Sequence, residues 1–374
     1  MLRLIACGIL ALPALLWQVL VLPVSVILSI PATFLMLYRD LTKADKVSPD
    51  RCHAIITGGS SGMGLGIARE CVRLGYARLT LLARNVDNLD KAAKELKAMA
   101  KDMGKTMEID FRSVDVSDAS ALKKMAGSLL KESHGNKIYL YCMAGQARPE
   151  YFEDTSVEVF DTCARVNQLG PIYTVQAFLP HMKAKGGAIL LCSSLAGQTG
   201  VFGFTAYSPT KFALQGFAQA LHMELAAASP PIHVMLAFPP DTDTPGYQAE
   251  NETKPAECAL ISEDGGLWQP DKVAKAFVRQ ATKPNPPFQI ALQFDHWMLC
   301  CLTTGFSPVT SWIDAVGHVT GLNLFRWVAL FYLQFWWITI RKYQGDQKKK
   351  EKEEVANAGA TKSSEETHSS SKDE

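Results

Sequence analysis

Short apolar runs alternate with longer amphipathic segments through the middle of the chain. Continuous apolar runs are typical of strands buried on both faces of a parallel sheet, and the segments between them have helical spacing. Because a helix is predicted in every crossover, the pattern predicts a doubly wound α/β sheet. The predicted strands are His53–Thr57, Arg78–Ala83, Glu108–Val114, Ile138–Cys142, Ala188–Cys192 and Ile232–Phe238. The predicted helices are Ile67–Leu74, Asn88–Met103, Asp118–His134, Val157–His181, Ala206–Ala228 and Asp271–Thr282.

Two apolar regions flank the predicted sheet. Leu4–Leu37 contains no charged residue, and about 20 apolar residues suffice to cross a bilayer, so we predict a membrane segment over residues 1–38. A cleaved signal peptide is the main alternative, but its apolar core is shorter than this run. From Phe288 to Ile340 the chain is again apolar and rich in aromatic residues. Residues 294–340 are predicted either to contact the membrane or to cap the pocket of a domain over residues 52–293.

Basic residues are unevenly placed around the first apolar region. Arg39, Lys43, Lys46 and Arg51 follow it, whereas only Arg3 and the amino terminus precede it. Because basic flanking residues tend to stay on the cytoplasmic side, the domain that follows is predicted to face the cytosol.

Composition narrows the class of protein further. The formal net charge of +1 gives no sign of a nucleic-acid partner. The nine cysteines include no CxxC pair and no companion histidine cluster, which argues against a metal site and against a disulfide framework. The polar stretch at the end of the chain predicts a disordered tail over residues 341–374.

A glycine-rich loop follows the first predicted strand and leads into a helix. Gly58, Gly62 and Gly64 let the backbone approach a pyrophosphate, whose charge then lies at the helix N-terminus. Ser60 and Ser61 belong to the same loop and are candidate phosphate ligands. A plain turn is the alternative, but the position between strand and helix favours dinucleotide binding.

The second predicted strand ends at Arg84, where an NAD enzyme usually carries an acid for the ribose 2′-hydroxyl. A guanidinium suits a 2′-phosphate instead, and Ser60 lies where it can reach the same phosphate. We therefore predict NADPH rather than NADH, with a solvated surface arginine as the alternative.

Tyr207 and Lys211 are four residues apart at the start of a predicted helix, so their side chains project from one face. An ammonium within about 4–6 Å of a phenol can lower the phenol pKa of ~10 by roughly 1–3 units. This predicts that Tyr207 is an acid/base group near neutral pH. Ser194, at the end of the fifth predicted strand, is placed to hydrogen-bond the same reacting oxygen. Taken alone, the pattern also fits an ordinary surface helix.

Together with the glycine loop, Ser194, Tyr207 and Lys211 resemble the short-chain dehydrogenase/reductase family over roughly residues 53–250. The resemblance implies a Rossmann-like fold and an oxidoreductase in which the tyrosine donates a proton and the serine orients the carbonyl oxygen. The lysine of that family lowers the tyrosine pKa and holds the nicotinamide ribose. Asn167 matches the fourth active-site residue, which fixes a backbone kink and a relay water; a polar residue facing solvent is the alternative.

The resemblance also assigns residues around the cofactor. It implies that Asp115 lies beside the adenine, that Ala144 and Gly145 allow close approach, and that Thr242 contacts the nicotinamide amide. In the stretch that begins at Cys142, the family commonly carries an asparagine that braces the sheet, and this chain has none there. We interpret Cys142 as a buried, packed thiol rather than a reactive group.

The loop Pro239–Gly246 and the following Glu250–Pro255 resemble members of the family that reduce a long-chain lipid ketone at the endoplasmic reticulum membrane. A steroid, a retinoid or another lipid ketone remains an alternative substrate. A catalytically silent dinucleotide-binding scaffold is the alternative from another class, motivated by the altered end of the fourth strand. The sequence leaves the oligomeric state open, and a homo-oligomer is compatible with it.

Overall fold

The computed structural model describes residues 48–132, 136–198, 200–255, 258, 266–284, 286–293, 296, 345–346 and 349–350. The chain divides into two units, Met1–Arg326 and Trp327–Glu374. Residues 345–346 and 349–350 of the second unit are helical. The predicted membrane segment 1–38, nearly all of segment 294–340 and most of tail 341–374 lie outside the described residues. Within the described part of the chain, no helix is both long enough and apolar enough to cross a membrane.

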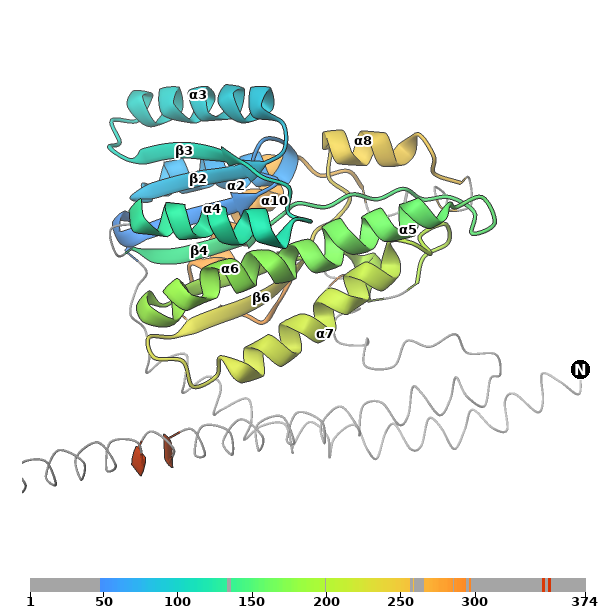
Figure 1. Ribbon diagram of the computed structural model, residues 1–374. Helices are drawn as coiled ribbons and strands as arrows, with labels where there is room; N and C mark the ends of the chain where they lie inside the picture. The colour runs from blue at the N-terminus through green and yellow to red at the C-terminus, as the bar shows by residue number, and fades with distance from the viewer. Residues whose placement is uncertain are drawn as a thin grey trace, which may run out of the picture. The chain divides into compact units, whose positions relative to one another are not determined.

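A seven-stranded parallel sheet forms the centre of the first unit, in the order β3-β2-β1-β4-β5-β6-β7 (Figure 1). The predicted strands are confirmed, and each end lies within one residue of its predicted place. The seventh strand was not predicted, because three residues after a proline-rich turn are too few to give a periodic pattern. The strands are β1 (Cys52–Thr57), β2 (Arg78–Ala83), β3 (Glu108–Ser113), β4 (Lys137–Cys142), β5 (Gly187–Cys192), β6 (Ile232–Phe238) and β7 (Gln289–Ala291).

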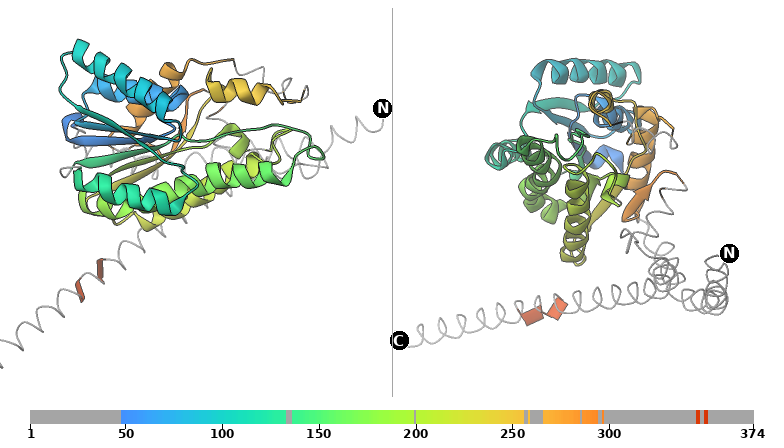
Figure 2. Two further views of the ribbon diagram at one scale, coloured as in Figure 1. Left: turned by 45° about the horizontal axis from the view of Figure 1, so that its top comes forward. Right: turned by 90° about the vertical axis from the view of Figure 1, so that its right-hand side faces the viewer.

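Helices cover both faces of the sheet, which gives three layers (Figure 2). One apolar core is shared by the sheet with α2 (Gly62–Leu74), α3 (Val86–Asp102) and α10 (Pro270–Ala281). The other core is shared with α4 (Ala119–Glu132), α6 (Gly170–Lys185) and α7 (Ser208–Glu224). This two-sided burial explains why the central strands are continuous apolar runs.

The predicted helix over 157–181 is three consecutive segments rather than one regular helix. An α-helix, α5 (Val157–Cys163), leads into a π-helical segment, η2 (Ala164–Leu169), and then into α6. Helical periodicity alone could not reveal this change, because the six residues of η2 are too few to show a period of their own. Such π segments often accompany functional sites, and η2 contains Asn167.

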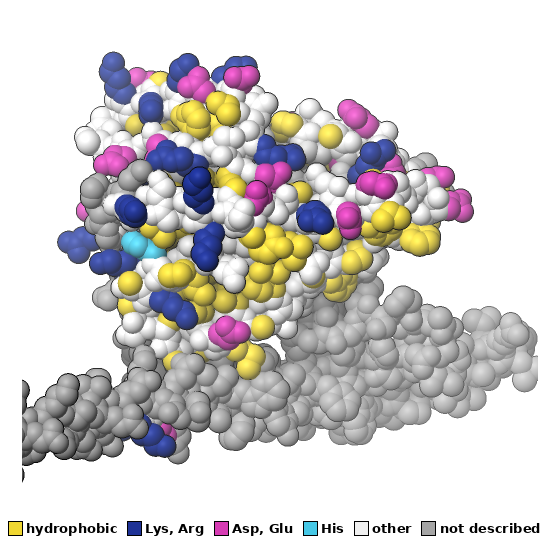
Figure 3. Space-filling model, viewed as in Figure 1, with side chains coloured by type: hydrophobic (Ala, Val, Ile, Leu, Met, Phe, Trp, Pro, Cys, Tyr) yellow, Lys and Arg dark blue, Asp and Glu magenta, His cyan; other side chains and the backbone are white. Residues whose placement is uncertain are grey.

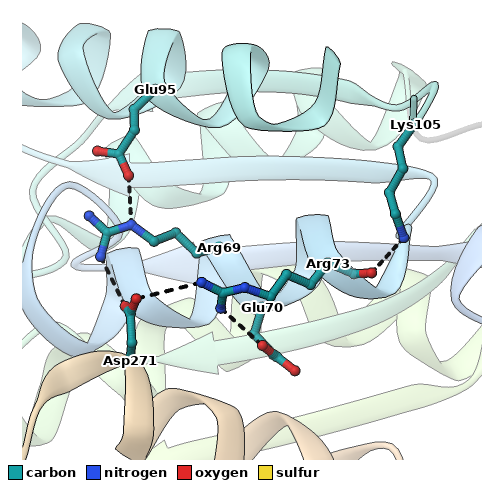
Figure 4. A network of polar contacts seen from close by, with 6 residues as sticks. All are labelled: Arg69, Glu70, Arg73, Glu95, Lys105 and Asp271. Carbon is teal, nitrogen blue, oxygen red and sulfur yellow. Dashed lines mark hydrogen bonds and ion pairs between the residues drawn. The ribbon is translucent and has the colours of Figure 1, made fainter. Parts of the chain in front are cut away.

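Ion pairs join the three helices of the first face (Figure 4). Arg69 of α2 lies 2.6 Å from Glu95 of α3 and 2.9 Å from Asp271 of α10. Arg73 contacts the same Asp271 at 3.6 Å and Glu70 at 3.0 Å. Most of these side chains are partly exposed, so each pair contributes only about 0–1 kcal/mol. The network therefore fixes the relative orientation of α2, α3 and α10 more than it adds stability.

Apolar side chains gather over α5 and α6 on the face seen in Figure 3, with charged side chains spread around them. Val157 at the start of α5 is 74% exposed, and Phe212 of α7 is 43% exposed. Exposed apolar areas commonly mark contact surfaces.

Candidate active site

A cavity of about 340 Å³ lies at the carboxyl ends of the strands, around β1 and β4. The strand order reverses between these two strands. From β1 the chain continues through β2 and β3 on one side of the sheet, and then returns to β4 on the other side of β1. Ligands of open α/β sheets bind in this crevice. Nine of the residues predicted to bind the cofactor line the cavity: Gly58, Ser60, Ser61, Gly62, Gly64, Arg84, Asp115, Ala144 and Gly145.

The glycine loop has the backbone that a bound pyrophosphate requires. Gly58 and Gly62 have φ angles of 66° and 52°, in the left-handed region that favours glycine. A side chain at Gly64 would collide with the carbonyl group of Gly58, so the loop can close tightly over the start of α2 only with glycine there. The geometry of the loop fits a dinucleotide, with its phosphates at the N-terminus of α2.

Thr57 joins this loop to β4. Its Oγ1 accepts hydrogen bonds from the backbone nitrogens of Met143, at 3.1 Å, and Ala144, at 3.2 Å. The hydroxyl therefore ties the ends of β1 and β4 together in the region where the usual asparagine is missing. Cys142 is 1% exposed, and burial raises the pKa of its thiol, which confirms the packed interpretation.

Arg84 and Asp115 lie near each other on the adenosine side of the cavity. Burial acts to raise the pKa of Asp115, but hydrogen bonds from the backbone nitrogen of Ser117, at 2.8 Å, and from its hydroxyl, at 2.7 Å, outweigh it, so the pKa is lowered. The positive charge of the exposed Arg84 contributes to the lowering. A guanidinium at this place can contact a ribose 2′-phosphate, and the fixed carboxylate can face a base.

Asn167 is fully buried, and both the oxygen and the nitrogen of its side-chain amide form hydrogen bonds. Its Oδ1 accepts from the backbone nitrogen of Gln146 at 2.9 Å, and its Nδ2 donates to the carbonyl of Gln146 at 2.8 Å. The solvent-facing alternative is therefore wrong. Asn167 fixes the backbone after β4, directly beside the end of the cavity.

Ser194, Tyr207 and Lys211 come together between β5 and α7. Ser194 follows β5 and hydrogen-bonds the Tyr207 hydroxyl. Tyr207 immediately precedes α7, and Lys211 lies one turn later with its Nζ 5.4 Å from the Tyr207 ring centroid. A side chain at Gly145 would lie 3.3 Å from Asn167 Oδ1 and 3.6 Å from Lys211 Nζ, so Gly145 leaves open the space that connects these groups to the cavity.

The predicted lowering of the Tyr207 pKa by Lys211 is wrong for this structure. Burial raises the pKa of Tyr207, and Ser194 opposes this only in part. The Lys211 ammonium instead donates to the carbonyl of Cys192 at 2.8 Å, and burial lowers its own pKa. The spacing of four residues predicted that Tyr207 and Lys211 lie on one face of the helix, but it carried no information on how deeply the two side chains are buried.

Thr242 does not line the cavity. Its buried hydroxyl donates to the Pro240 carbonyl at 2.7 Å, so the expected contact with a nicotinamide amide finds no support. Thr244, Pro245 and Gly246 line the cavity instead. These three residues lie in the same loop, but their sequence alone did not distinguish Thr244 from Thr242.

Thr57, Gln146 and Thr244 are among the residues at the site that were not predicted from the sequence. Thr57 braces the loop, and Thr244 lines the cavity. The backbone groups of Gln146 are hydrogen-bonded to the Asn167 side chain. Thr57 was detectable as a hydroxyl residue at the end of a buried strand. Gln146 was not, because it acts through its backbone.

Comparison with known proteins gives concordant matches. A family model described as short chain dehydrogenase matches residues 52–255. The 3-dehydrosphinganine reductase of Danio rerio is 42% identical over 285 residues, which cover 75% of this chain and 83% of that protein. The 3-ketodihydrosphingosine reductase of Bos taurus is 40% identical over 308 residues, or 82% of this chain and 91% of that protein.

Among solved structures, the chain is similar to an alcohol dehydrogenase from the archaeon Thermococcus sibiricus, complexed with 5-hydroxy-NADP. The match has a TM-score of 0.54 and 27% sequence identity, and it covers 64% of this chain and 96% of that chain.

Proposed function

The chain belongs to the short-chain dehydrogenase family, and from this premise we propose that it reduces the 3-keto group of 3-ketodihydrosphingosine to dihydrosphingosine with NADPH. The observation that carries the proposal is the identity of 40% with the bovine reductase over 82% of this chain. The arrangement of Ser194, Tyr207 and Lys211 beside a dinucleotide-shaped cavity supports the same chemistry.

The chain supplies acid catalysis and positioning, and NADPH, when bound, supplies the hydride. Tyr207 donates a proton to the carbonyl oxygen as it becomes an alkoxide, and the raised pKa of Tyr207 keeps this donor protonated. Ser194 hydrogen-bonds the same oxygen and polarises the carbonyl. Lys211 holds the nicotinamide ribose and, through its charge, assists the proton transfer. Asn167 fixes the backbone that borders this space. The resemblance to the family further assigns it the retention of a relay water.

The cofactor would be held by the glycine loop and by the ends of β2, β3 and β4. Backbone groups of Gly58–Gly64 with Ser60 and Ser61 receive the phosphates, and Arg84 receives the 2′-phosphate. Asp115 faces the adenine, and Ala144 and Gly145 allow the rest of the cofactor to approach β4.

Purified protein assayed with several ketones tests this function. We expect NADPH oxidation with detergent-dispersed 3-ketodihydrosphingosine to exceed that with steroid or retinoid ketones by at least about tenfold in kcat/KM. Faster turnover of a steroid or retinoid ketone would reassign the substrate. Failure to oxidise NADPH with any ketone would favour the silent scaffold.

We infer that the enzyme is anchored in the endoplasmic reticulum membrane by residues 1–38, with domain 52–293 facing the cytosol. The supporting observations are the uncharged run Leu4–Leu37 and the basic residues that follow it. Residues 294–340 contact the membrane near the substrate entrance in this arrangement. A substrate with one long alkyl chain resides in the bilayer, because each buried methylene contributes about 0.8 kcal/mol.

The orientation can be tested with the natural acceptor sequence Asn251-Glu252-Thr253. Asn251 is exposed at the end of α8 (Pro245–Asn251), so it would be accessible if the domain lay in the lumen. We expect no endoglycosidase-sensitive mass shift in intact cells. A second acceptor sequence in an extension placed before Met1 is the control and should be glycosylated. A shift that disappears with Asn251→Gln would reverse the orientation.

A further inference from the structure

A second group of charged side chains lies beside the candidate active site, on the segment that follows β6. Lys254 Nζ is 3.0 Å from Glu250 Oε1, and the two side chains are only 5% and 17% exposed. The same ammonium lies 4.8 Å from the ring centroid of Tyr247. Tyr247 in turn hydrogen-bonds Asp241, so these four side chains form one connected cluster.

The segment that carries Glu250 packs against the turn that precedes Tyr207. A side chain at Gly203 would lie 3.3 Å from Pro255, and the ring centroid of the next residue, Phe204, lies 5.3 Å from that of Tyr207. Burial is the main cause of the raised pKa of Tyr207, and the negative charge of Glu250 is the second cause. A charge that acts on the phenol also acts on a group bound next to the phenol. Glu250 is therefore within electrostatic reach of the substrate carbonyl and of its neighbouring substituents.

The cluster contains two carboxylates and one lysine. Lys254 interacts with both Glu250 and Asp241, and His296 lies close enough to Asp241 to favour its charged form. Burial raises the pKa of each carboxyl group, because the charged form loses contact with water, and Lys254 opposes the shift only in part. A further cation beside these carboxylates would favour their charged forms in the same way as Lys254 does.

The substrate of the proposed function supplies such a cation. The ketone 3-ketodihydrosphingosine carries an amino group on the carbon next to its carbonyl. When the carbonyl oxygen is hydrogen-bonded to a phenol, the amino nitrogen lies within roughly 4–6 Å of the phenol oxygen. The negative charge of Glu250 acts electrostatically on the same phenol.

Resting on the proposed function, we propose that Glu250 binds the ammonium group of the substrate and thereby selects 2-amino ketones over other lipid ketones. Lys254 is a positioning residue that holds the carboxylate in place. A purely stabilising role explains the pair less well, because a buried ion pair is commonly no more stable than well-packed apolar residues in its place. The electrostatic influence of Glu250 on the reacting tyrosine is what a recognition role requires.

The test compares two ketones of equal chain length, 3-ketodihydrosphingosine and the analogue with hydrogen in place of the amino group. Glu250→Gln is expected to lower kcat/KM for the amino ketone by about 10- to 100-fold, because a charge-assisted contact is lost. For the analogue without the amino group, the change should stay within about threefold. Glu252→Gln, an exposed residue two positions later, is the matched control and should leave both values unchanged.

A second variant accounts for the lysine that Glu250→Gln leaves without this partner. The double variant Glu250→Gln with Lys254→Gln removes both charges and should show the same loss of preference, with NADPH affinity and circular dichroism unchanged. Equal losses with both ketones in both variants would overturn the proposal and make Glu250 structural.

Competition by octadecylamine separates this proposal from the proposed function. The amine has the alkyl chain and the cation but no carbonyl, so it acts as an inhibitor and not as a substrate. Its inhibition is measured with the analogue that lacks the amino group as the substrate, so the result does not depend on turnover of an amino ketone. The inhibition constant should rise about 10-fold or more in Glu250→Gln. An unchanged constant would overturn the ammonium site. Failure of the wild type to reduce 3-ketodihydrosphingosine, with reduction of the analogue intact, would instead overturn the proposed substrate.

Discussion

Replacing Tyr207 with Phe is expected to lower ketone reduction by at least about 100-fold, because a positioned acid contributes roughly 10²–10⁴-fold to such a step. The variant loses the hydroxyl but keeps the ring, which packs 5.3 Å from the ring of Phe204. The packing around the cavity should therefore survive, and NADPH should still bind. Steady-state kinetics with 3-ketodihydrosphingosine and titration of the nicotinamide fluorescence measure the two effects separately.

Tyr173→Phe provides the matched control. Tyr173 lies in α6 and packs against the core on that side of the sheet, away from Ser194 and Lys211 in the chain. Its loss of a hydroxyl should change kcat/KM by no more than about twofold. Turnover within a few-fold of the wild type in Tyr207→Phe would exclude the tyrosine as the proton donor.

Arg84→Ala is expected to raise the dissociation constant for NADPH by roughly 10- to 150-fold and to leave that for NADH unchanged. The reason is that a charge-assisted contact with the 2′-phosphate contributes about 1.5–3 kcal/mol, and NADH has no such phosphate. Arg84 is exposed and lines the cavity, so its removal should not disturb the core. Fluorescence titration with both cofactors provides the comparison.

Two further variants make this result specific. Arg51→Ala removes an exposed arginine that precedes β1, at the opposite end of that strand from the glycine loop, and should affect neither cofactor. Arg84→Lys keeps the charge but loses the planar fork of donors, so it should retain part of the preference for NADPH. Equal losses of NADPH and NADH affinity in Arg84→Ala would make the arginine structural.

Much of the fold could be predicted from the sequence, because the forces that define it are local or follow the chain. The inner strands β1, β2, β4, β5 and β6 are mainly apolar runs since helices cover both faces of the sheet, and such runs are visible in the sequence. The edge strand β3 alternates apolar and polar residues instead. The loop from Gly58 to Gly64 was also readable, since positive φ angles and close backbone approach favour glycine. The short strand β7 and the π segment η2 were missed, because neither produces a period of its own.

The sequence by itself identified three groups of the candidate site, Ser194, Tyr207 and Lys211. The spacing of Tyr207 and Lys211 on one helical turn and the position of Ser194 after a strand required no tertiary information. Only the tertiary structure decided how those groups are surrounded. It placed Lys211 against the Cys192 carbonyl, raised rather than lowered the pKa of Tyr207, and put Glu250, from the segment after β6, within electrostatic range of the same tyrosine. Burial and contacts between segments that are distant in the chain set the pKa of Tyr207 and the charges around it. Burial and long-range contacts leave no pattern in the order of residues, so the sequence could not predict them.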